Sequence, residues 1–556
     1  MPLESSSRVV QALASRGYNA EREAVTLIAE ADAPGVALET AVEVAPDDAL
    51  VITTDHVREA LATEPVPDPS ALDEDATDDR GTADGVSASE GSAAGDGSPV
   101  TDGSPAPQTP SVSSGTESTY PTDDGGRVPD ETGGSIDEST TGDPSPENSR
   151  VGDRSPPAPV VANDMTGEST GTGEYDEFVG VFRDRYERLS GQLRGRVNHR
   201  PADSIEAMGG GADVETIGLV NDIRSTASGH WLIELEDTTG TFPCLVMKDR
   251  DIADLVDELL LDECIAVSGT LADDAGIVFV DAIHFPDVPR THRPSTADRH
   301  VQAALISDVH VGSQEFLADA WSRFADWLHT EEAERVEYLL IAGDMVEGVG
   351  VYPGQDEELD IVDIYDQYER FSEHLKQVPG DMEIVMIPGN HDAVRLAEPQ
   401  PGFDEELREI MSAHDPQIVS NPAVVDVEGV SILMYHGVSL DEVIAELPEE
   451  KASYDEPHKA MYQLLKKRHV APQFGGKTRV APEERDYLAI DEVPDVFHTG
   501  HVHKLGWGKY HNVLAVNSGC WQAQTDFQKS VNIDPDVAHA PILDLDTLDM
   551  TVRKFV

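Results

Sequence analysis

Six short apolar segments alternate with longer amphipathic ones in the second half of the chain, and this alternation constrains the fold more than any other feature. The strand-like segments read VQAALI, VEYLLIA, EIVMI, VSILMY, DVFHT and NVLAVNS. The clearest helix-like segments read FLADAWSRFADWLHTEEA, IVDIYDQYERFSEHL and PHKAMYQLLKKRH. Strands that alternate with helices are typical of layered α/β domains, whose functional groups lie on loops at strand ends. We therefore expect a layered α/β domain over residues 300–556.

Possible metal ligands directly follow five of these six predicted strands. A single His or Asp after a strand is more often a helix cap or a satisfied core residue. Five such groups in succession, each at the end of a predicted strand, favour a shared site instead. The residues are Asp308 and His310 after the first strand, Asp344 after the second, Asn390, His391 and Asp392 after the third, His436 after the fourth, and His501 and His503 after the fifth.

The donor atoms indicate which metals such a site would hold. They come from carboxylates, imidazoles and one amide, without a thiolate, which suits Mn²⁺, Fe²⁺ or Zn²⁺ better than a soft metal. Where two ions lie about 3.5 to 4 Å apart, one ligand must bridge them. A carboxylate bridges best because its two oxygens can face different ions, so Asp344 is the predicted bridge. Glycines beside Asp344, Asn390, His436 and His501 allow the sharp turns that convergence requires.

Taken in this order, the residues resemble the motifs of the calcineurin-like metallophosphoesterase superfamily, which are Asp-x-His, Gly-Asp, Gly-Asn-His-Asp, His and Gly-His-x-His. The resemblance implies two divalent ions. One ion would be held by Asp308, His310, Asp344 and His503, and the other by Asp344, Asn390, His436 and His501. It also implies that His391 is no ligand but faces the scissile phosphate as the catalytic residue, while Asp392 supports its neighbours.

Four longer stretches narrow the resemblance. SDVHVGSQEF, YPGQDEELDIVDIYDQYERF, IPGNHDAVRLAEPQP and NSGCWQAQTDFQKSVN are similar to the small subunits of archaeal family-D replicative DNA polymerases, and the similarity extends over residues 175–556. That family implies a 3′-to-5′ exonuclease that removes misincorporated nucleotides, usually with two Mn²⁺ ions. It also implies DNA as the substrate and a large polymerising subunit as the partner. Contact with a sliding clamp through the complex stays open.

Two other functions are compatible with parts of the sequence. Related B-subunits of eukaryotic replicative polymerases have lost the metal ligands and serve as scaffolds, so a non-catalytic structural subunit is one alternative. The intact ligand set argues against this as the sole role. A free-standing metal-dependent phosphodiesterase would keep the site, but it would explain neither the preceding domain nor the polymerase-like stretches.

Residues 174–299 are expected to hold a helix followed by an OB-fold barrel. In YDEFVGVFRDRYERLSGQLRGR, apolar residues recur at three- and four-residue steps on one helical face. We expect its five arginines to pair with acidic neighbours rather than with phosphate. Residues 214–285 then form five predicted strands with a helix after the third, which is the plan of an OB-fold. Because few aromatic or basic residues occupy those strands, subunit contact is at least as strong an interpretation as DNA binding.

The first 173 residues have two different compositions. Residues 1–62 contain three segments with helix caps and apolar residues at helical spacing, which predicts a small helical module for docking. The segments are SSSRVVQALASRG (residues 5–17), NAEREAVTLIAEA, with Val25 and Ile28, and TTDHVREAL. Residues 63–173 are rich in Gly, Ser, Thr, Pro and Asp, and Tyr120 is their only aromatic residue. Such a segment cannot bury enough apolar surface to offset its chain entropy. We expect a disordered acidic linker there.

The charge of the whole chain indicates its environment. Asp and Glu number 107 against 39 Lys and Arg, which gives a net charge of −68, and the first lysine is Lys248. Such self-repulsion is tolerable where salt screens it, since the Debye length falls to about 3 Å at 1 M. We therefore expect a halophilic archaeon as the source.

The three cysteines are too scattered for a disulfide framework, and no apolar stretch approaches the ~20 residues that span a bilayer, so a cytoplasmic location is expected.

Overall fold

The computed structural model describes residues 9, 13, 19–20, 22–29, 31, 34–45, 51–63, 156–168, 173, 175–352, 354–530 and 533–556. They belong to two compact units, one within Met1–Gly152 and the other within Asp153–Val556, and each is described by itself. Most of the predicted linker, residues 64–155, lies outside the described residues. The same holds for most of the first predicted helix, residues 5–17. Residues 156–168 of the predicted linker are ordered instead: Val160 and Val161 pair with the strand Ala423–Val427, and Met165 is fully buried, so the prediction of disorder is wrong for this stretch.

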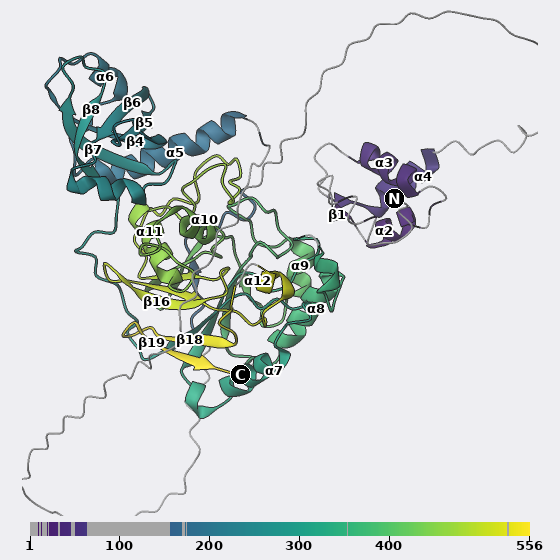
Figure 1. Cartoon of the computed structure of the whole chain (residues 1–556). Helices are drawn as coiled ribbons and strands as arrows, with labels where there is room; N and C mark the ends of the chain where they lie inside the picture. Colours follow the sequence, from purple (N-terminus) through teal and green to yellow (C-terminus); the bar gives the residue numbers. More distant parts are fainter. Residues whose placement is uncertain are drawn as a thin grey trace, which may run out of the picture. The chain divides into compact units, whose positions relative to one another are not determined.

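The described part of the first unit has three helices around a small apolar core (Figure 1). The elements are β1 (Asn19–Ala20), α2 (Arg22–Ala29), α3 (Pro34–Val44), β2 (Val51–Ile52) and α4 (Thr54–Thr63), and β1 and β2 pair in parallel. Val25 and Ile28 of α2 are buried in this core, at the spacing that the sequence predicted. Helix α3 was not predicted. Pro34 suits its first turn because the N–H of that position needs no partner.

A closed five-stranded barrel lies in the second unit. Its strands are β4 (Asp213–Ser225), β5 (Trp231–Asp237), β6 (Gly240–Val246), β7 (Cys264–Leu271) and β8 (Val278–His284), in the order β4-β5-β6-β8-β7. The element predicted after the third strand is a 3-10 helix, η1 (Asp251–Glu258). Alternate strand residues such as Ile233 and Leu235 are buried in the barrel core, since successive side chains of a strand point to opposite faces. The five strands that the sequence predicted are present.

Helix α5 (Tyr175–Leu193) packs against the barrel through Tyr186, Leu189 and Leu193. On another side of the helix, Arg188 forms an ion pair with Asp491 of the C-terminal part. The helix therefore connects the barrel to the sheets that follow it in the sequence. For Arg188, the prediction that arginines of this helix pair with acidic residues is confirmed.

Two buried ion pairs strengthen the connection between the barrel region and the C-terminal part. Arg185 Nε of α5 lies 2.6 Å from Asp486 Oδ2, and both side chains are buried. Lys467 Nζ lies 3.1 Å from Glu263 Oε2, next to the start of β7, and these side chains are fully buried as well. Removing one partner of such a pair leaves an uncompensated buried charge, which typically costs about 3 to 5 kcal/mol. The pairs therefore hold the two parts in a defined contact.

Two six-stranded sheets make up the C-terminal part of the second unit. The first, in the order β12-β11-β10-β9-β18-β19, consists of β9 (Gln302–Ile306), β10 (Val336–Ala342), β11 (Glu383–Ile387), β12 (Gln417–Ile418), β18 (His539–Asp544) and β19 (Asp549–Lys554). The second, in the order β16-β17-β15-β14-β13-β3, consists of β3 (Val160–Val161), β13 (Ala423–Val427), β14 (Val430–Met434), β15 (Val496–Thr499), β16 (Leu505–Tyr510) and β17 (Val513–Ser518). All six strand segments that the sequence predicted are present, as β9, β10, β11, β14, β15 and β17.

Strand directions and burial explain how the sheets pack. Strands β9 to β12 run parallel, as do β14, β15 and β17. One cluster of buried residues contains side chains of both sheets, so the sheets face each other across it. Near-continuous apolar segments such as those of β10 and β11 are expected for parallel strands that are buried on both faces.

Helices pack against the other face of each sheet. The helices that share buried clusters with the first sheet are α7 (Ala318–Leu328), α8 (Ile364–Leu375) and α9 (Glu405–Ile410), and those that do so with the second are α10 (Ser439–Glu446) and α11 (Pro457–Lys467). The remaining short elements are α6 (Ala202–Glu206), η2 (Glu331–Ala333), η3 (Gln355–Glu357) and α12 (Asp526–Ser530).

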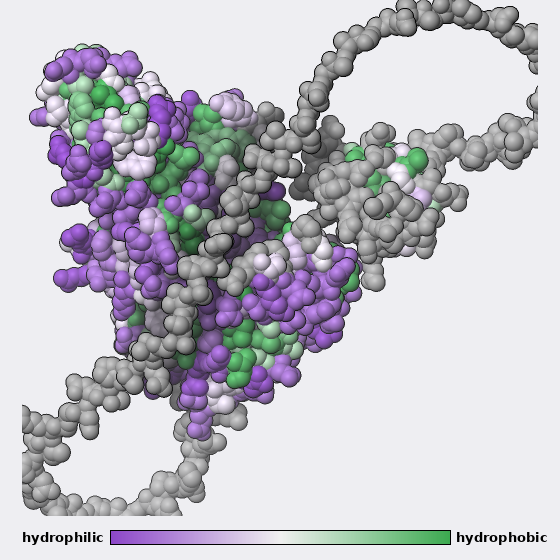
Figure 2. Space-filling model, viewed as in Figure 1, coloured by the Kyte–Doolittle hydropathy of each residue, from purple (hydrophilic) through white to green (hydrophobic). Residues whose placement is uncertain are grey.

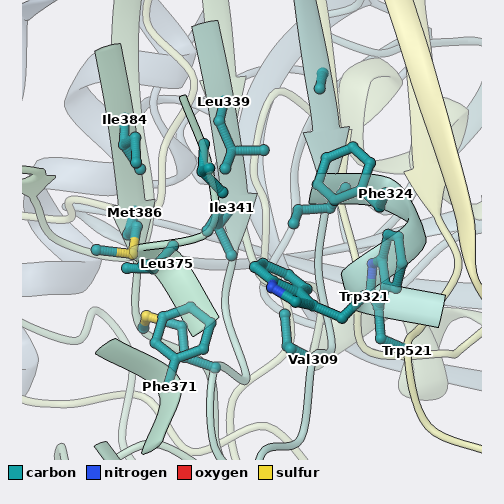
Figure 3. Close-up of a cluster of buried hydrophobic side chains, with 14 of the residues drawn as sticks. Val309, Trp321, Phe324, Leu339, Ile341, Phe371, Leu375, Ile384, Met386 and Trp521 are labelled. Carbon is teal, nitrogen blue, oxygen red and sulfur yellow. The ribbon is translucent and has the colours of Figure 1, made fainter. Parts of the chain in front are cut away.

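The core beneath α7 and α8 is rich in aromatic side chains (Figure 3). Trp321 and Phe324 of α7 are three positions apart, so they lie on the same helical face and pack against Trp521. Phe371 of α8 closes the cluster on the other side, with its ring centroid 6.1 Å from that of Trp321. Val309 belongs to the same cluster, which matters for the site because it lies between two predicted ligands.

The visible surface of the described residues is mostly hydrophilic, with hydrophobic side chains gathered in smaller areas (Figure 2). This agrees with a chain in which 26% of the residues are charged. Within the described ranges, the structure has no helix with the length and hydropathy that crossing a membrane requires.

Candidate metal centre

The predicted site residues lie where parallel strands of both sheets end. Asp308, Asp344 and Asn390 follow β9, β10 and β11 of the first sheet, whereas His436 and His501 follow β14 and β15 of the second. The carboxyl ends of parallel strands meet at one edge of a sheet, so residues far apart in the sequence converge there. The two sets also contact each other directly. The backbone N–H of His501 lies 3.1 and 2.9 Å from the two carboxylate oxygens of Asp308.

The backbone of these loops has an uncommon conformation. The φ angles are 52° at Asp308, 55° at His310, 52° at Asp344, 71° at His501 and 55° at His503. Each such non-glycine residue costs about 1 to 3 kcal/mol and persists where its surroundings hold it.

The apolar residues at the centre of two of these motifs help to stabilise this backbone conformation. Val309, between Asp308 and His310, is fully buried in the core beneath α7. Val502, between His501 and His503, is buried against the second sheet and its helices. The apolar residue at the centre of each motif therefore anchors the loop, and its two polar neighbours are directed to the site.

Two glycines are required because the motifs approach each other closely. A Cβ atom on Gly389 would lie 2.2 Å from Asp344 Oδ1. A Cβ atom on Gly343, whose φ is 90°, would lie 2.5 Å from His436 Nδ1. Real Cβ atoms are not found at such distances from other heavy atoms, so any other residue would separate the motifs.

The first ligand group consists of Asp308, His310 and His503. His310 Nε2 lies 3.0 Å from His503 Nε2, and His503 Nε2 lies 3.4 Å from Asp308 Oδ1. On its other side, His310 Nδ1 lies 2.9 Å from Glu347 Oε2, a carboxylate oxygen that can only accept, so this contact favours the ring proton on Nδ1. Burial lowers the pKa of His310 and favours the neutral ring, so Nε2 presents a lone pair to the group. This is the arrangement of a metal-ligating histidine oriented by a second carboxylate.

The second group consists of Asp344, Asn390 and His436. His436 Nδ1 lies 2.9 Å from the carbonyl oxygen of Ala342, which can only accept, so Nδ1 carries the proton of the neutral ring. Its Nε2 then presents a lone pair to two oxygens, Asn390 Oδ1 at 3.0 Å and Asp344 Oδ2 at 3.2 Å.

Three acceptors that converge on one point repel each other unless a positive charge lies among them. Without metal, a proton takes this place. Burial lowers the pKa of His436, but the charge of Asp344 and a hydrogen bond to it outweigh burial and raise the pKa to about 10. A divalent cation satisfies the same acceptors, so the residues present fit a metal ion.

Asp344 belongs to the second group and also faces the first. Its Oδ1 accepts a hydrogen bond from the backbone N–H of His391 at 2.8 Å. Its Oδ2 lies 3.2 Å from His436 Nε2 and 3.8 Å from His310 Nε2, so one oxygen faces both groups. Burial alone would raise the pKa of this carboxyl, but the imidazoles around it hold the pKa well below its usual range. Asp344 is therefore an anion whose single oxygen Oδ2 faces both groups. The predicted arrangement, in which each oxygen faces a different ion, is not seen because Oδ1 accepts the His391 N–H.

His501 lies beside the second group. The centroid of its ring is 5.2 Å from that of His436, and its Nε2 lies 3.4 Å from Asp441 Oδ2. Asp441 also accepts a hydrogen bond from the Tyr454 hydroxyl at 2.9 Å. Burial raises the pKa of Asp441, but His501, Tyr454 and Lys477 outweigh burial and lower it to about 2. Asp441 is therefore an anion that orients the His501 ring.

His391 lies beside the two ligand groups but is a member of neither. Its Nδ1 lies 2.7 Å from the carbonyl oxygen of Glu347, so Nδ1 donates and Nε2 is left for other contacts. The ring packs edge-on against that of His310, with 4.8 Å between centroids. Its side chain keeps 16% of its surface exposed, more than the 2% of His310, which suits a group that meets a ligand from outside.

Asp392 points away from the ligand groups. Its Oδ2 accepts hydrogen bonds from the backbone N–H groups of Gly389 and Met345, and its Oδ1 accepts one from the Tyr368 hydroxyl. Burial and the nearby charge of Asp344 raise the pKa of Asp392 to about 7. Asp392 thus ties the loop after β11 to the loop after β10, in agreement with the supporting role expected for it.

Sequence reasoning missed several residues that orient the site. Glu347 lies three positions after Asp344 and contacts both His310 and His391, yet no local pattern distinguishes it from the many other acidic residues. Gln522 Nε2 lies 2.6 Å from Glu347 Oε2, and Gln528 Nε2 lies 2.9 Å from His503 Nδ1. Both glutamines come from NSGCWQAQTDFQKSVN, a stretch singled out by its resemblance rather than by chemistry.

Comparison with known proteins identifies relatives along the whole chain. The family model for the B subunits of DNA polymerases alpha and epsilon matches residues 303–505. The chain is 64% identical over 555 residues to a DNA polymerase II small subunit of Halobacterium salinarum, covering 100% of both proteins. It is 44% identical to a DNA polymerase II small subunit of Archaeoglobus fulgidus over 67% of this chain and 76% of that protein. A solved archaeal phosphodiesterase, 14% identical, aligns with 46% of this chain and 99% of its own with a TM-score of 0.24, which carries no weight here.

Proposed function

Because this chain belongs to the family of archaeal DNA polymerase II small subunits, the family-D polymerases, we propose that it carries the 3′-to-5′ exonuclease of a two-subunit replicative enzyme. A small subunit of this polymerase implies a large catalytic subunit as its partner. The proposed activity would remove misincorporated nucleotides from the 3′ end of DNA.

One observation carries this proposal: two groups of acceptors lie side by side, and Asp344 Oδ2 faces both, at 3.2 Å from His436 Nε2 of its own group and 3.8 Å from His310 Nε2 of the other. Burying carboxylates and imidazoles in this way, on loops with a strained backbone, is unfavourable unless they are compensated. A subunit that served only as a scaffold would gain nothing from such a cluster. The purely structural alternative therefore leaves the most costly feature of the fold unexplained, although a scaffolding role can coexist with catalysis.

The residues that would hold the ions follow from the two groups. The first ion would be held by Asp308, His310, Asp344 and His503, and the second by Asp344, Asn390, His436 and His501. Two divalent cations, which we propose to be Mn²⁺, supply an activated water and neutralise charge on the phosphoryl oxygens. Since the donors are oxygen and imidazole nitrogen, the site suits this class of metal.

The protein's own groups divide the remaining work. His391 donates from Nδ1 to a backbone carbonyl, so Nε2 is the ring nitrogen left for the substrate, and in the doubly protonated ring it would give its proton to the departing 3′ oxygen. Glu347 fixes both His310 and His391, through its carboxylate and its carbonyl oxygen. The backbone N–H of His501 fixes the Asp308 carboxylate. These contacts keep lone pairs and protons on the atoms where a phosphodiester hydrolysis needs them.

The other parts of the chain have proposed roles that follow from the sequence. We propose that residues 1–62 dock a partner, that the predicted linker over residues 63–173 is a tether as far as the ordered residues 156–168, that residues 174–299 hold an OB-fold domain and that residues 300–556 form the exonuclease domain. The buried ion pairs between the barrel region and the C-terminal part support a joint surface for the large subunit. DNA is the proposed substrate.

The test uses the complex of this chain with its large subunit, purified in high salt. A 3′-labelled single strand should be shortened in the presence of Mn²⁺ and not in the presence of a chelator. Asp344→Asn should abolish cleavage because a neutral amide cannot bridge two cations, while polymerisation continues since the large subunit carries that site. If the wild-type complex leaves the strand intact with Mn²⁺, the exonuclease proposal is wrong.

A further inference from the structure

The segment 474–479, FGGKTR, crosses the surface beside the metal centre and differs in charge from the rest of the chain. It contains Lys477 and Arg479 and no acidic residue, in a protein with a net charge of −68. Both side chains are exposed, and among the described residues neither has a carboxylate within ion-pair distance. By contrast, seven of the eleven lysines make ion pairs: Lys376, Lys451, Lys459, Lys466, Lys467, Lys504 and Lys529. We call residues 474–479 the rim.

The rim is fixed beside the candidate ligands of the second metal. The backbone N–H of Lys477 lies 2.9 Å from Glu442 Oε1. Glu442 follows Asp441 in α10, and Asp441 contacts the ring of His501. Gly476 permits this approach, since a Cβ atom on it would meet the Glu442 carboxylate oxygen.

The far end of the rim reaches the loop that follows His391. The backbone N–H of Glu398 donates to the carbonyl oxygen of Arg479 at 2.8 Å, and Ala481 N–H donates to the carbonyl oxygen of Glu398 at 2.7 Å. The two exposed cations are thus attached at one side to the helix behind His501 and at the other to the chain that leaves the Asn390 motif. They flank the second metal position on the protein surface.

The first residue of the rim is an exposed aromatic side chain. Phe474 keeps 42% of its surface accessible, while its ring packs edge-on against Phe178 and Phe182 of α5, at 5.6 and 5.5 Å between centroids. Its backbone N–H donates to Asp262 Oδ2 of the barrel region at 2.9 Å. Lys477 follows three positions later in the chain, a reach of about 10 Å at most. The rim therefore runs from the metal centre to the barrel.

An exposed aromatic ring next to unpaired cations is the combination by which proteins bind single-stranded nucleic acid, since bases stack on the ring and cations follow the phosphates. We propose that the rim binds the single-stranded 3′ end of DNA, with Lys477 and Arg479 on its phosphates and Phe474 against a base. This deepens the proposed exonuclease function and rests on it. The 3′ end of a fully paired DNA duplex would not bind in this way, because its bases are stacked inside the duplex and are not free to stack on Phe474.

A metal-independent measurement tests the rim directly. Fluorescence anisotropy of a labelled oligothymidine with the full chain, in EDTA and at several KCl concentrations, gives the binding constant and its salt dependence. For Lys477→Ala with Arg479→Ala, the slope of log affinity against log salt should fall by about 1.4, or about 0.7 for each lost phosphate contact. Phe474→Leu, which keeps an apolar side chain in the packing position, should weaken binding about 5- to 100-fold through lost stacking.

A matched control removes the same charge elsewhere. Lys509 and Lys554 are exposed on β16 and β19 and likewise lack an ion-pair partner within the described parts of the chain. Lys509→Ala with Lys554→Ala should leave the slope unchanged, because these positions lie outside the rim. If both double variants change the slope equally, or if neither does, the rim is not a DNA site.

Cleavage by the assembled complex separates failure of the rim from failure of the exonuclease proposal. The rim variants should raise KM for a 3′-labelled single strand about tenfold or more, whereas KM for a small phosphodiester, bis(p-nitrophenyl) phosphate, which offers the rim neither a further phosphate nor a base, should change far less. A wild-type complex that cleaves neither substrate would overturn the exonuclease function, and the anisotropy result would still decide the rim. If the rim variants no longer co-purify with the large subunit, the segment is a subunit contact and the DNA proposal is wrong.

Discussion

Glu347→Gln offers the sharpest test of how the metal centre is assembled. Glu347 is 2% exposed, and its carboxylate receives the Nδ1 proton of His310 at 2.9 Å, together with the Gln522 amide at 2.6 Å and the Gln355 amide at 3.1 Å. Burial raises the pKa of Glu347, but His310 and the other donors outweigh burial and lower it from 4.5 to about 2. The replacement has the same shape and removes only the charge and one acceptor.

The expected magnitude follows from that network. A pKa lowered from 4.5 to about 2 corresponds to about 3 kcal/mol in favour of the anion, shared among all its donors. An amide placed against several donors must direct its NH₂ group at one of them. The most sensitive is His310, because its Nε2 can accept a metal only while Nδ1 keeps the proton. We therefore expect a loss of about 10- to 100-fold in metal affinity, the usual effect of removing such an orienting residue.

Calorimetric titration of the metal-free full chain with Mn²⁺ measures this affinity, and circular dichroism verifies that the variant is folded. Glu369→Gln is the matched control, since Glu369 is exposed on α8 and its replacement removes the same charge. The control should bind Mn²⁺ like the wild type. If Glu347→Gln binds both ions within about twofold of the wild-type affinity, then Glu347 does not orient His310, and the reasoning is refuted.

Three further predictions follow from the site and the composition. Asn390→Ala should lose one ion and cleavage together, with partial recovery in excess Mn²⁺, whereas His391→Ala should keep both ions while cleavage slows by about 10² to 10⁴; equal loss of metal in both variants would reverse these roles. Folding should require salt because of the −68 charge, so circular dichroism should show unfolding as KCl is removed, and a stable metal-free fold at millimolar salt would contradict this. Burial raises the pKa of Glu398 from 4.5 to about 7, so its folded form retains a proton that the unfolded chain releases; stability should fall by about 3 kcal/mol as pH rises from 4.5 to 7, and Glu398→Gln should remove that fall in urea titrations.

The sequence allowed the ligands to be predicted because each follows an apolar segment of strand length. The segments VQAALI and EIVMI have the near-continuous apolar character of buried parallel strands, whereas DVFHT has only Val496 and Phe497 as apolar residues; β9, β11 and β15 lie within these three segments. A buried parallel strand must end at the sheet edge, so the polar residues that follow have their positions defined by the strand. This inference from strand to sheet edge needs no knowledge of tertiary contacts. It allowed Asp308 and His501 to be predicted at the edge where the site lies.

The same logic does not extend to antiparallel strands at the sheet edges or to orienting residues. Strand β19 has only exposed and half-buried residues and no buried one, a weak pattern in a chain with many polar segments, and it was not predicted. Glu347 orients His310 through a contact between the loops after β10 and β9, which only the parallel pairing of these strands creates. The helix expected after the third barrel strand is instead a 3-10 helix, a difference that periodicity over eight residues cannot resolve.

The rim and the acidic surface together address how so negative a protein could hold DNA. At about 1 M salt the Debye length is about 3 Å, so repulsion from distant carboxylates is screened, and so is attraction by distant cations. Only contacts at hydrogen-bonding distance and stacking then contribute. At high salt, Lys477 and Arg479 beside the metal centre would therefore contribute more to DNA affinity, through direct contacts with phosphates, than positive charge spread over the whole surface would. The balance should also shift with salt: as KCl rises, the phosphate contacts weaken while stacking on Phe474 persists, so Phe474→Leu should become the more damaging of the two rim variants.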